Sequence, residues 1–346
     1  MTAPLLRVSG LRTWFPIRRG VWQKTVGWVR AVDGVDLEVN EGETVALVGE
    51  SGCGKTTVGR SITRLIEPCA GSVTFAGQEL TKLTPRQLRT ARRHIQMVFQ
   101  DPATSLNPRM RVRDILAEGL EAFGIGSGVS ERTDRVAELL KRVRLEPEHM
   151  MRFPHEFSGG QRQRIGIARA LSVEPRLIVL DEAVSALDVS IQAQILNLLS
   201  RLQQEDGLAY LFITHDLSVV RYLARRVSVM YLGQIVEEAE TEALFAQPQH
   251  PYTRGLLAAA PSADPEHPNI EARVLGDVPS PADPPKGCRF HTRCPEAFDR
   301  CSVEPPPVVQ LGSRKVRCLL HEPAERDPGV SSESGSSGVA PGREAT

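Results

Sequence analysis

The sequence predicts an α/β fold organised around a largely parallel β-sheet. Two short runs, 176-RLIVLDE-182 and 208-LAYLFITH-215, are almost entirely apolar, as is typical of strands buried on both faces of a parallel sheet. The segment between them, 190-SIQAQILNLLSRLQQE-205, has helical periodicity. The order strand, helix, strand favours right-handed crossover connections and therefore an α/β sheet.

The N-terminal part of the chain is predicted to form strands and then a helix. Residues 5–48 contain short β-rich runs, and the last of these, 44-TVALV-48, ends in a glycine-rich turn. A helix is predicted from Lys55 to about Ile66, followed by a turn and strand over 71-GSVTFAG-77.

The middle of the chain, from about 101 to 173, has a mainly helical pattern. Within it, 130-SERTDRVAELLKRV-143 predicts a helix with Ser130 as its N-cap. Strands return around 227–239. After about residue 245 prolines become frequent, and the segment 323–346 is so rich in Ser, Gly, Pro and charge that we expect a disordered tail.

Composition limits the classes of function. The 346-residue chain is 41% hydrophobic and 24% charged, so it has ample material for a globular core. Its 42 basic and 42 acidic residues cancel, and the absence of a global basic field disfavours nucleic acid as a partner. No apolar run approaches the ~18–20 residues needed to span a bilayer, and the start lacks the apolar segment of a signal peptide. We therefore expect a cytosolic protein with reduced thiols, whose membrane role would come through a partner.

The glycine-rich turn carries a phosphate-binding pattern. The stretch 49-GESGCGKTT-57 fits G-x-x-x-x-G-K-[ST] between an apolar strand and a helix, the context that this motif requires. Backbone N–H groups and the helix N-terminus would face phosphate, Lys55 would reach the β- and γ-phosphates, and Thr56 would ligate Mg²⁺. The sequence therefore predicts a P-loop NTPase whose triphosphate site comprises Gly49, Glu50, Ser51, Gly52, Cys53, Gly54, Lys55, Thr56 and Thr57.

Two carboxylates follow a later buried strand. Asp181 ends that strand and can hold Mg²⁺ through water, whereas Glu182 can polarise the attacking water. A pair of solvated strand-end carboxylates is the alternative, which the phosphate loop disfavours.

A second anion-facing turn, 157-FSGGQRQRIGIARAL-171, precedes an amphipathic helix. A chain with a complete phosphate loop needs no second one for its own nucleotide, so this turn can serve the nucleotide of another molecule. Here the sequence resembles the ATP-binding subunits of ABC transporters, whose signature motif corresponds to Ser158, Gly159, Gly160 and Gln161.

The resemblance covers roughly residues 5–322 and implies roles for further residues. Gln100 matches the Q-loop and would touch Mg²⁺ or the water, with Thr56 and Asp181 as the other magnesium residues. Asp188 matches the D-loop, and His215 matches the switch histidine that contacts the γ-phosphate. Phe15 stands where the family stacks an aromatic on adenine, with Trp14 as a rival and core packing of Phe15 as an alternative.

The resemblance also implies a mechanism. Two cassettes associate head to tail, and each sandwiches ATP between its own phosphate loop and the partner's signature turn. Glu182 acts as the base and His215 stabilises developing charge, and hydrolysis reopens the pair.

Two segments, 100-QDPATSLNPRM-110 and 250-HPYTRGLLAAAP-261, resemble peptide and nickel importers. The insertion over 16–35 and the stretch 185-SALDVSIQAQI-195 look most like the second ATPase of oligopeptide and dipeptide importers. An ATPase of a nickel or other small-solute importer is the alternative, followed by a soluble ABC ATPase outside transport.

The resemblance implies an assembly and a division of the chain. The partners would be a second ABC ATPase (another copy or a different chain), two transmembrane permease subunits and, indirectly, an extracytoplasmic binding protein, with this chain peripheral on the cytoplasmic face. The expected parts are an ABC cassette over 1–245 with a helical subdomain over about 101–157, a C-terminal extension over 246–322, and the tail.

Four cysteines in the extension have the spacing C-x5-C-x6-C-x16-C: Cys288, Cys294, Cys301 and Cys318. Structural zinc usually uses a short C-x2–4-C pair, and disulfides are disfavoured in the cytosol. Widely spaced thiolates favour a polynuclear centre, and the resemblance implies a [4Fe–4S] cluster, as in some peptide-importer ATPases. Zinc, with His291 or His321 as substitute ligands, and unliganded packing cysteines are the alternatives.

Overall fold

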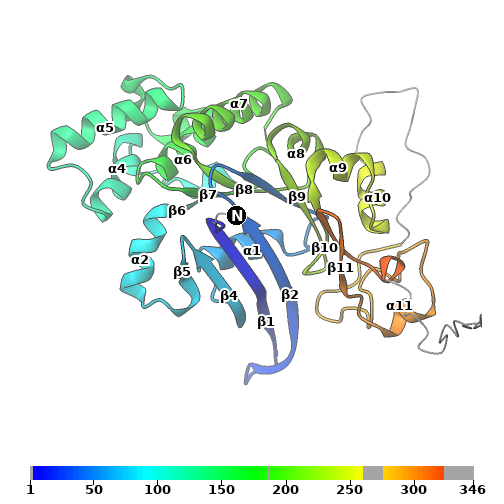
Figure 1. The fold of residues 1–346 in the computed structure, drawn as a ribbon. Coiled ribbons are helices and arrows are strands. Elements are labelled where there is room, and N and C mark those ends of the chain that lie inside the picture. Colours follow the sequence, from blue (N-terminus) through cyan, green and yellow to red (C-terminus); the bar gives the residue numbers. More distant parts are fainter. Residues whose placement is uncertain (1–2, 186, 260–275, 323–346) are drawn as a thin grey trace, which may run out of the picture.

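The computed structural model describes residues 3–185, 187–259 and 276–322, which build two β-sheets with helices around them (Figure 1). The larger sheet has the strand order β11-β12-β10-β9-β3-β8-β7-β6, and the smaller has the order β2-β1-β4-β5. The strands of the larger sheet are β3 (Thr44–Val48), β6 (Ile95–Val98), β7 (Leu177–Asp181), β8 (Ala209–Thr214), β9 (Arg226–Tyr231), β10 (Gln234–Glu240), β11 (Val308–Leu311) and β12 (Arg314–Arg317).

The centre of the larger sheet is parallel and buried on both faces. Strand β3 pairs in parallel with β8 and β9, and β7 pairs in parallel with β6 and β8. Along β7, Ile178 and Leu180 face a core shared with helices, whereas Leu177 and Val179 face a core shared with the smaller sheet. This two-sided burial explains the nearly unbroken apolar runs in the sequence, and the α/β prediction is confirmed.

The smaller sheet is antiparallel and contains β1 (Leu6–Arg19), β2 (Lys24–Val39), β4 (Ala70–Phe75) and β5 (Gln78–Glu79). Most of the insertion over 16–35 forms the outer half of a long β1–β2 hairpin, seen in Figure 1 as the blue ribbon that projects from the molecule. At its tip Trp22 is 94% exposed. Nearer the core, Leu6 and Val8 are fully buried.

Helices connect and cover the strands: α1 (Lys55–Ile62), α2 (Pro85–His94), α3 (Pro102–Ser105), α4 (Val112–Ala122), α5 (Val129–Arg142), α6 (Gly159–Leu171), α7 (Val189–Asp206), α8 (Leu217–Leu223), α9 (Thr241–Ala246) and α10 (Pro251–Ala258). Helices α4 to α6 share a buried core through Leu116, Val136 and Ile165. None of the helices in the described part of the chain is long and apolar enough to cross a membrane.

Two helix boundaries differ from the prediction. Helix α1 ends at Ile62 instead of about Ile66, because Arg64 takes a positive φ of 52° that no helix continues through. Ser130 is not an N-cap, so that prediction is wrong. Helix α5 already begins at Val129 with Gly128 at its N-cap, and Ser127 binds the Glu131 carboxylate through its N–H and hydroxyl.

The residues 276–322, here called the C-terminal module, extend the larger sheet by the two strands β11 and β12. Strand β12 pairs with β10, and the module also contains a short helix, α11 (Asp299–Val303) (Figure 1). Phe290 of the module sits among the rings of Tyr231 and Tyr252, with centroid distances of 5.2 and 5.4 Å. The predicted disordered tail, 323–346, lies outside the described residues.

The predicted [4Fe–4S] cluster is wrong. Among the residues that the structure describes, which include all four cysteines, no three or more Cys, His, Asp or Glu side chains form a group that could hold a metal ion. The zinc alternative is excluded with it. Burial raises the pKa of Cys288, and raises that of Cys294 and Cys318 to about 11, so these groups remain protonated thiols at neutral pH.

Their actual role is packing. Cys301 and Cys318 are buried, and Cys288 and Cys294 pack against the apolar cluster that contains Phe290.

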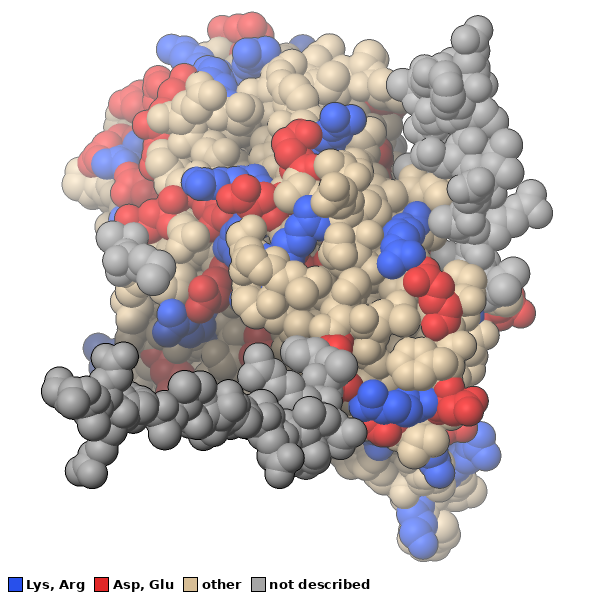
Figure 2. All heavy atoms as spheres, turned by 45° about the vertical axis from the view of Figure 1, so that its right-hand side comes forward, with Lys and Arg blue, Asp and Glu red and all other residues tan. Residues whose placement is uncertain are grey.

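Charges of both signs are interspersed over the face on which the module lies, as Figure 2 shows. Many of these side chains pair, for example Arg254 with Glu296 at 2.5 Å and Arg300 with Glu304 at 2.8 Å.

His250 predicts a pH dependence of stability. The side chain is 1% exposed, its Nδ1 accepts the Tyr252 N–H at 3.0 Å, and burial together with the nearby His321 and Arg254 lowers its pKa to about 3. An unfolded histidine has a pKa near ~6.5, so below that pH the unfolded chain binds a proton that the folded chain does not. The free energy of unfolding should therefore fall by up to about 1.4 kcal/mol per pH unit from this residue as the pH drops from ~6.5 towards 3.

Urea unfolding at about pH 7.5 and 5.5 measures this slope. His250→Asn keeps an acceptor for the Tyr252 N–H and should flatten the slope, whereas the exposed His155 gives the control variant His155→Asn, which should not. Equal slopes in the wild type and His250→Asn would contradict the assignment.

Candidate nucleotide-binding and catalytic site

The phosphate loop is formed where β3 passes into α1. Gly49 and Gly54 have φ values of 157° and 110° and lie against other backbone segments. A Cβ atom on Gly49 would stand 2.1 Å from the Met230 carbonyl oxygen, and one on Gly54 would stand 2.0 Å from the Ala31 carbonyl oxygen. Only glycine fits at either position, so the motif glycines are required by close backbone approach as well as by conformation.

Lys55 and Thr56 begin α1 and point back into the site. The buried Lys55 donates from Nζ to the Gly49 carbonyl at 2.8 Å and to the Glu50 carbonyl at 3.0 Å. Thr56 donates from Oγ1 to Asp181 Oδ1 at 2.9 Å. Burial raises the pKa of Asp181 in spite of this hydrogen bond, because desolvation disfavours the charged carboxylate.

Glu182 lies at the centre of a second group. Its Oε2 accepts from Gln100 Nε2 at 2.8 Å, and its Oε1 lies 3.4 Å from His215 Nδ1. The three residues follow β6, β7 and β8, whose carboxyl ends lie side by side in the parallel sheet. Glu182 has a positive φ of 47°, and its N–H donates to the Ile213 carbonyl. Such backbone strain in a non-glycine residue is typical of functional positions.

A cavity of about 230 Å³ joins the two groups. It is lined by Ser51, Gly52, Gly54, Lys55, Thr56 and Thr57 together with Gln100, Glu182, Val29, Ala31 and Pro281. Phosphate-loop amides, a cation and a carboxylate therefore face one space, as binding and hydrolysis of a nucleoside triphosphate require.

Phe15 and Trp14 lie on opposite faces of the β1–β2 hairpin. Phe15 stands directly opposite Val29, which lines the cavity, and opposite residues of an antiparallel pair share a face. Phe15 is 37% exposed, which speaks against core packing. Trp14 instead donates from Nε1 to Asp33 at 3.2 Å and lies under the Arg30 guanidinium.

The signature turn lies at the start of α6. Ser158 and Gln161 form reciprocal hydrogen bonds as a capping box, with distances of 3.3 and 3.0 Å. A Cβ atom on Gly160 would stand 2.3 Å from an Ile191 methyl group, so this glycine lets α6 approach α7 closely. The four signature residues are not among the described residues that line the 230 Å³ cavity, and Asp188 is exposed at the N-cap of α7.

The residues present fit Mg²⁺. The hydroxyl of Thr56 and the carboxylate of Asp181 are adjacent oxygen ligands of the kind that Mg²⁺ prefers. Gln100, the third predicted magnesium residue, lines the same cavity as Thr56 and donates a hydrogen bond to Glu182.

Several residues at the site were missed by sequence reasoning, among them Val29 and Ala31, which line the cavity. Pro281 lines the cavity, Tyr252 Oη accepts the Glu50 N–H at 3.0 Å, and Arg293 binds the Glu50 carboxylate. Tyr252 belongs to the stretch 250-HPYTRG-255, a signal that indicated a class of protein but not a contact with the phosphate loop.

Family models match two parts of the chain. A model described as ABC transporter matches residues 32–185, and one described as the C-terminal region of oligopeptide and dipeptide transporters matches residues 236–301. Among curated relatives, the probable peptide ABC transporter ATP-binding protein y4tS of Sinorhizobium fredii is 51% identical over 94% of this chain and 92% of the relative. The oligopeptide transport ATP-binding protein AppF of Bacillus subtilis is 50% identical over 92% of this chain and 97% of the relative.

Solved structures agree in fold. The cbiO1 protein of Clostridium perfringens, part of the ABC transporter complex cbiONQ, superposes with a TM-score of 0.60 and 27% identity over 70% of this chain and 91% of its own. The cassette MJ0796, described as a post-hydrolysis dimer bound to ADP and phosphate, gives a TM-score of 0.59 and 28% identity over 68% of this chain and 98% of its own.

Proposed function

Because the chain belongs to the ABC transporter ATP-binding proteins of the oligopeptide and dipeptide group, we propose that it hydrolyses ATP to drive peptide uptake through permease partners. The chain is an ATPase, and the proposal concerns what that activity powers. The observation that carries it is the presence, in one chain, of the nucleotide site and of the C-terminal region typical of peptide transporters.

The site suggests a division of labour in hydrolysis. Lys55 and the amides at the N-terminus of α1 hold the β- and γ-phosphates. Glu182 accepts a proton from the attacking water while Gln100 and His215 orient its carboxylate. Bound Mg²⁺, held by Thr56 and Asp181, supplies neutralisation of charge on the phosphates.

A second cassette completes the site in this proposal. At the N-terminus of α6, Ser158 and Gly159 are exposed, and none of the four signature residues lines the chain's own cavity as far as the structure describes it. In a head-to-tail pair this turn would meet the partner's γ-phosphate, with Asp188 near the same interface. The partner is another copy of this chain or a second ATPase of the same group.

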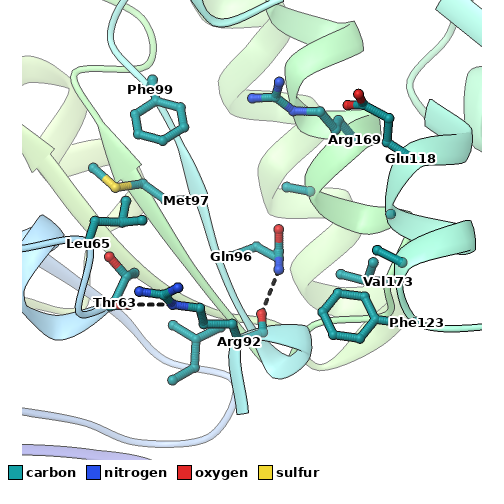
Figure 3. A pocket seen from close by; sticks show the side chains of 14 residues that line it. Thr63, Leu65, Arg92, Gln96, Met97, Phe99, Glu118, Phe123, Arg169 and Val173 are labelled. Atoms are coloured by element: carbon teal, nitrogen blue, oxygen red, sulfur yellow. Dashed lines mark hydrogen bonds between the residues drawn. The ribbon is translucent and has the colours of Figure 1, made fainter. Parts of the chain in front are cut away.

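The permease subunits would dock in a groove beside Gln100. A second cavity, of about 430 Å³, lies between β6 and α2 on one side and α4 and α6 on the other. Figure 3 shows Phe99, Phe123 and Met97 around it, with Glu118 and Arg169 projecting from the helices. A permease helix inserted here would press beside Phe99, and so next to the residue that holds Glu182. The transport step and the hydrolytic step would thus be mechanically linked.

Filling this groove should uncouple the chain from its permease. Ala122 is exposed at its rim, so Ala122→Trp occupies the groove without entering the core. We expect at least about a tenfold loss of peptide-stimulated hydrolysis and of co-purification with the permease, with basal ATPase activity retained. The exposed Val129 of α5 gives the control Val129→Trp, which should behave as wild type. If peptide stimulation and co-purification with the permease were normal in Ala122→Trp, the groove would not be the docking site of the permease.

Measurement of solute uptake by cells tests which solute is transported. Cells that lack this chain should fail to accumulate a labelled tripeptide or pentapeptide and recover uptake when it is restored. Recovery of labelled nickel uptake without peptide uptake would replace peptide as the cargo, and recovery of neither would place the ATPase outside import.

A further inference from the structure

The second residue of the phosphate loop, Glu50, is held from outside the loop. Arg293 of the C-terminal module binds both carboxylate oxygens of Glu50, at 2.9 and 3.2 Å. Tyr252 of α10 accepts the Glu50 N–H at 3.0 Å, and the Glu50 carbonyl accepts from Lys55 at 3.0 Å. One phosphate-loop residue thus connects the C-terminal part of the chain to the lysine that faces the nucleotide cavity.

The contact between Arg293 and Glu50 is partly shielded from solvent. The Arg293 side chain is 8% exposed and the Glu50 side chain 27% exposed. The guanidinium lies 5.8 Å from the centre of the Tyr231 ring and donates to Tyr231 Oη at 3.4 Å. A bidentate ion pair in such surroundings fixes geometry, and the loss of one partner leaves the other charge poorly compensated.

The module also supports the opposite side of the loop. Arg289 binds the Leu232 carbonyl, in the turn between β9 and β10, and the Asp33 carboxylate of β2. In that turn Gly233 donates its N–H to the Cys53 carbonyl at 2.9 Å. Pro281 accepts the Arg30 N–H at 3.0 Å and itself lines the nucleotide cavity.

We propose that the C-terminal module is a positioning element of the nucleotide site, and that Arg293 and Tyr252 hold Glu50 so that the phosphate loop is preorganised for nucleotide. The loop contains glycines whose backbones are intrinsically free, so restraints from outside lower the entropy lost on binding. The inference depends on ATP binding alone and not on the identity of the cargo.

The test is nucleotide affinity of the full chain, measured by titration of a fluorescent ADP analogue with Mg²⁺. Arg293→Gln should raise the Kd about tenfold, equal to about 1.4 kcal/mol. The KM for ATP should rise similarly, while kcat at saturating ATP stays within about twofold. Arg293→Lys keeps the charge without the bidentate contact and should recover part of the affinity.

The matched control is Arg300→Gln, which removes an exposed arginine of the same module that pairs with Glu304 and Glu322. It should leave the Kd unchanged. A double-mutant cycle then isolates the contact. If the two side chains act through each other, the double variant Arg293→Gln/Glu50→Gln should have a nucleotide Kd no higher than that of the single variant that binds more weakly.

Two results would overturn the proposal. One is that Arg293→Gln binds nucleotide with the same Kd as the wild type, whether or not its thermal stability falls. The other is full additivity of the Arg293 and Glu50 substitutions. Should Arg293→Gln fail to fold, Tyr252→Phe keeps the packed ring and loses only the acceptor for the Glu50 N–H, and it should raise the Kd by about fivefold. An unchanged Kd in that variant would likewise overturn the proposal.

Discussion

Glu182→Gln should reduce the rate of ATP hydrolysis by at least about a hundredfold while nucleotide still binds. The amide has nearly the shape of the carboxylate, so the contacts with Gln100 and His215 keep their spacing. It cannot take the proton of the attacking water, and general base catalysis contributes about 10²–10⁴ to such reactions. Phosphate release and fluorescent nucleotide binding, measured on the same preparation, separate the two effects.

The control for charge is Glu205→Gln, which removes an exposed carboxylate of α7 that pairs only loosely, at 3.8 Å, with Arg201. It should hydrolyse ATP at the wild-type rate. Hydrolysis by Glu182→Gln within about threefold of wild type would show that another group is the base.

Lys55→Ala should weaken nucleotide binding itself. Its Nζ is the one cation among the described residues that line the 230 Å³ cavity, and it is held by two carbonyls of the loop. Its removal leaves the β- and γ-phosphates with backbone donors alone, and we expect the Kd for ATP to rise at least about a hundredfold, or about 2.8 kcal/mol.

Equilibrium titration of the full chain measures this change. The exposed Lys141 of α5 provides the control variant Lys141→Ala, which should bind normally. A Kd within about threefold of wild type in Lys55→Ala would mean that the cavity is not the triphosphate site.

Much of the site could be predicted from the sequence because its signals are local. A strand, a glycine-rich turn and a lysine occupy one short stretch, and the close backbone contacts at Gly49 and Gly54 leave no room for a larger residue at either position. Gln100, Glu182 and His215 are far apart in the chain but each follows a buried strand, and a parallel sheet brings such positions together.

The contacts that the sequence could not predict are those without a local pattern. Arg293 and Glu50 are 243 residues apart, and nothing near Arg293 distinguishes it from the other arginines of the module. The prediction of a metal cluster at the cysteines was wrong for a related reason. Their spacing was compatible with a cluster, but a ligand set also needs convergent side chains, and the fold uses these thiols for packing.

Peptide-stimulated ATP hydrolysis in liposomes that contain this chain, its permease subunits and its binding protein tests the central claim most directly. We expect a peptide-loaded binding protein to raise hydrolysis several-fold, roughly 1 kcal/mol of barrier, with peptide accumulating inside the liposomes and both effects lost in Glu182→Gln. A rate of ATP hydrolysis that does not change with peptide, or peptide accumulation that persists in Glu182→Gln, would contradict the claim that ATP cleavage at this site powers peptide import.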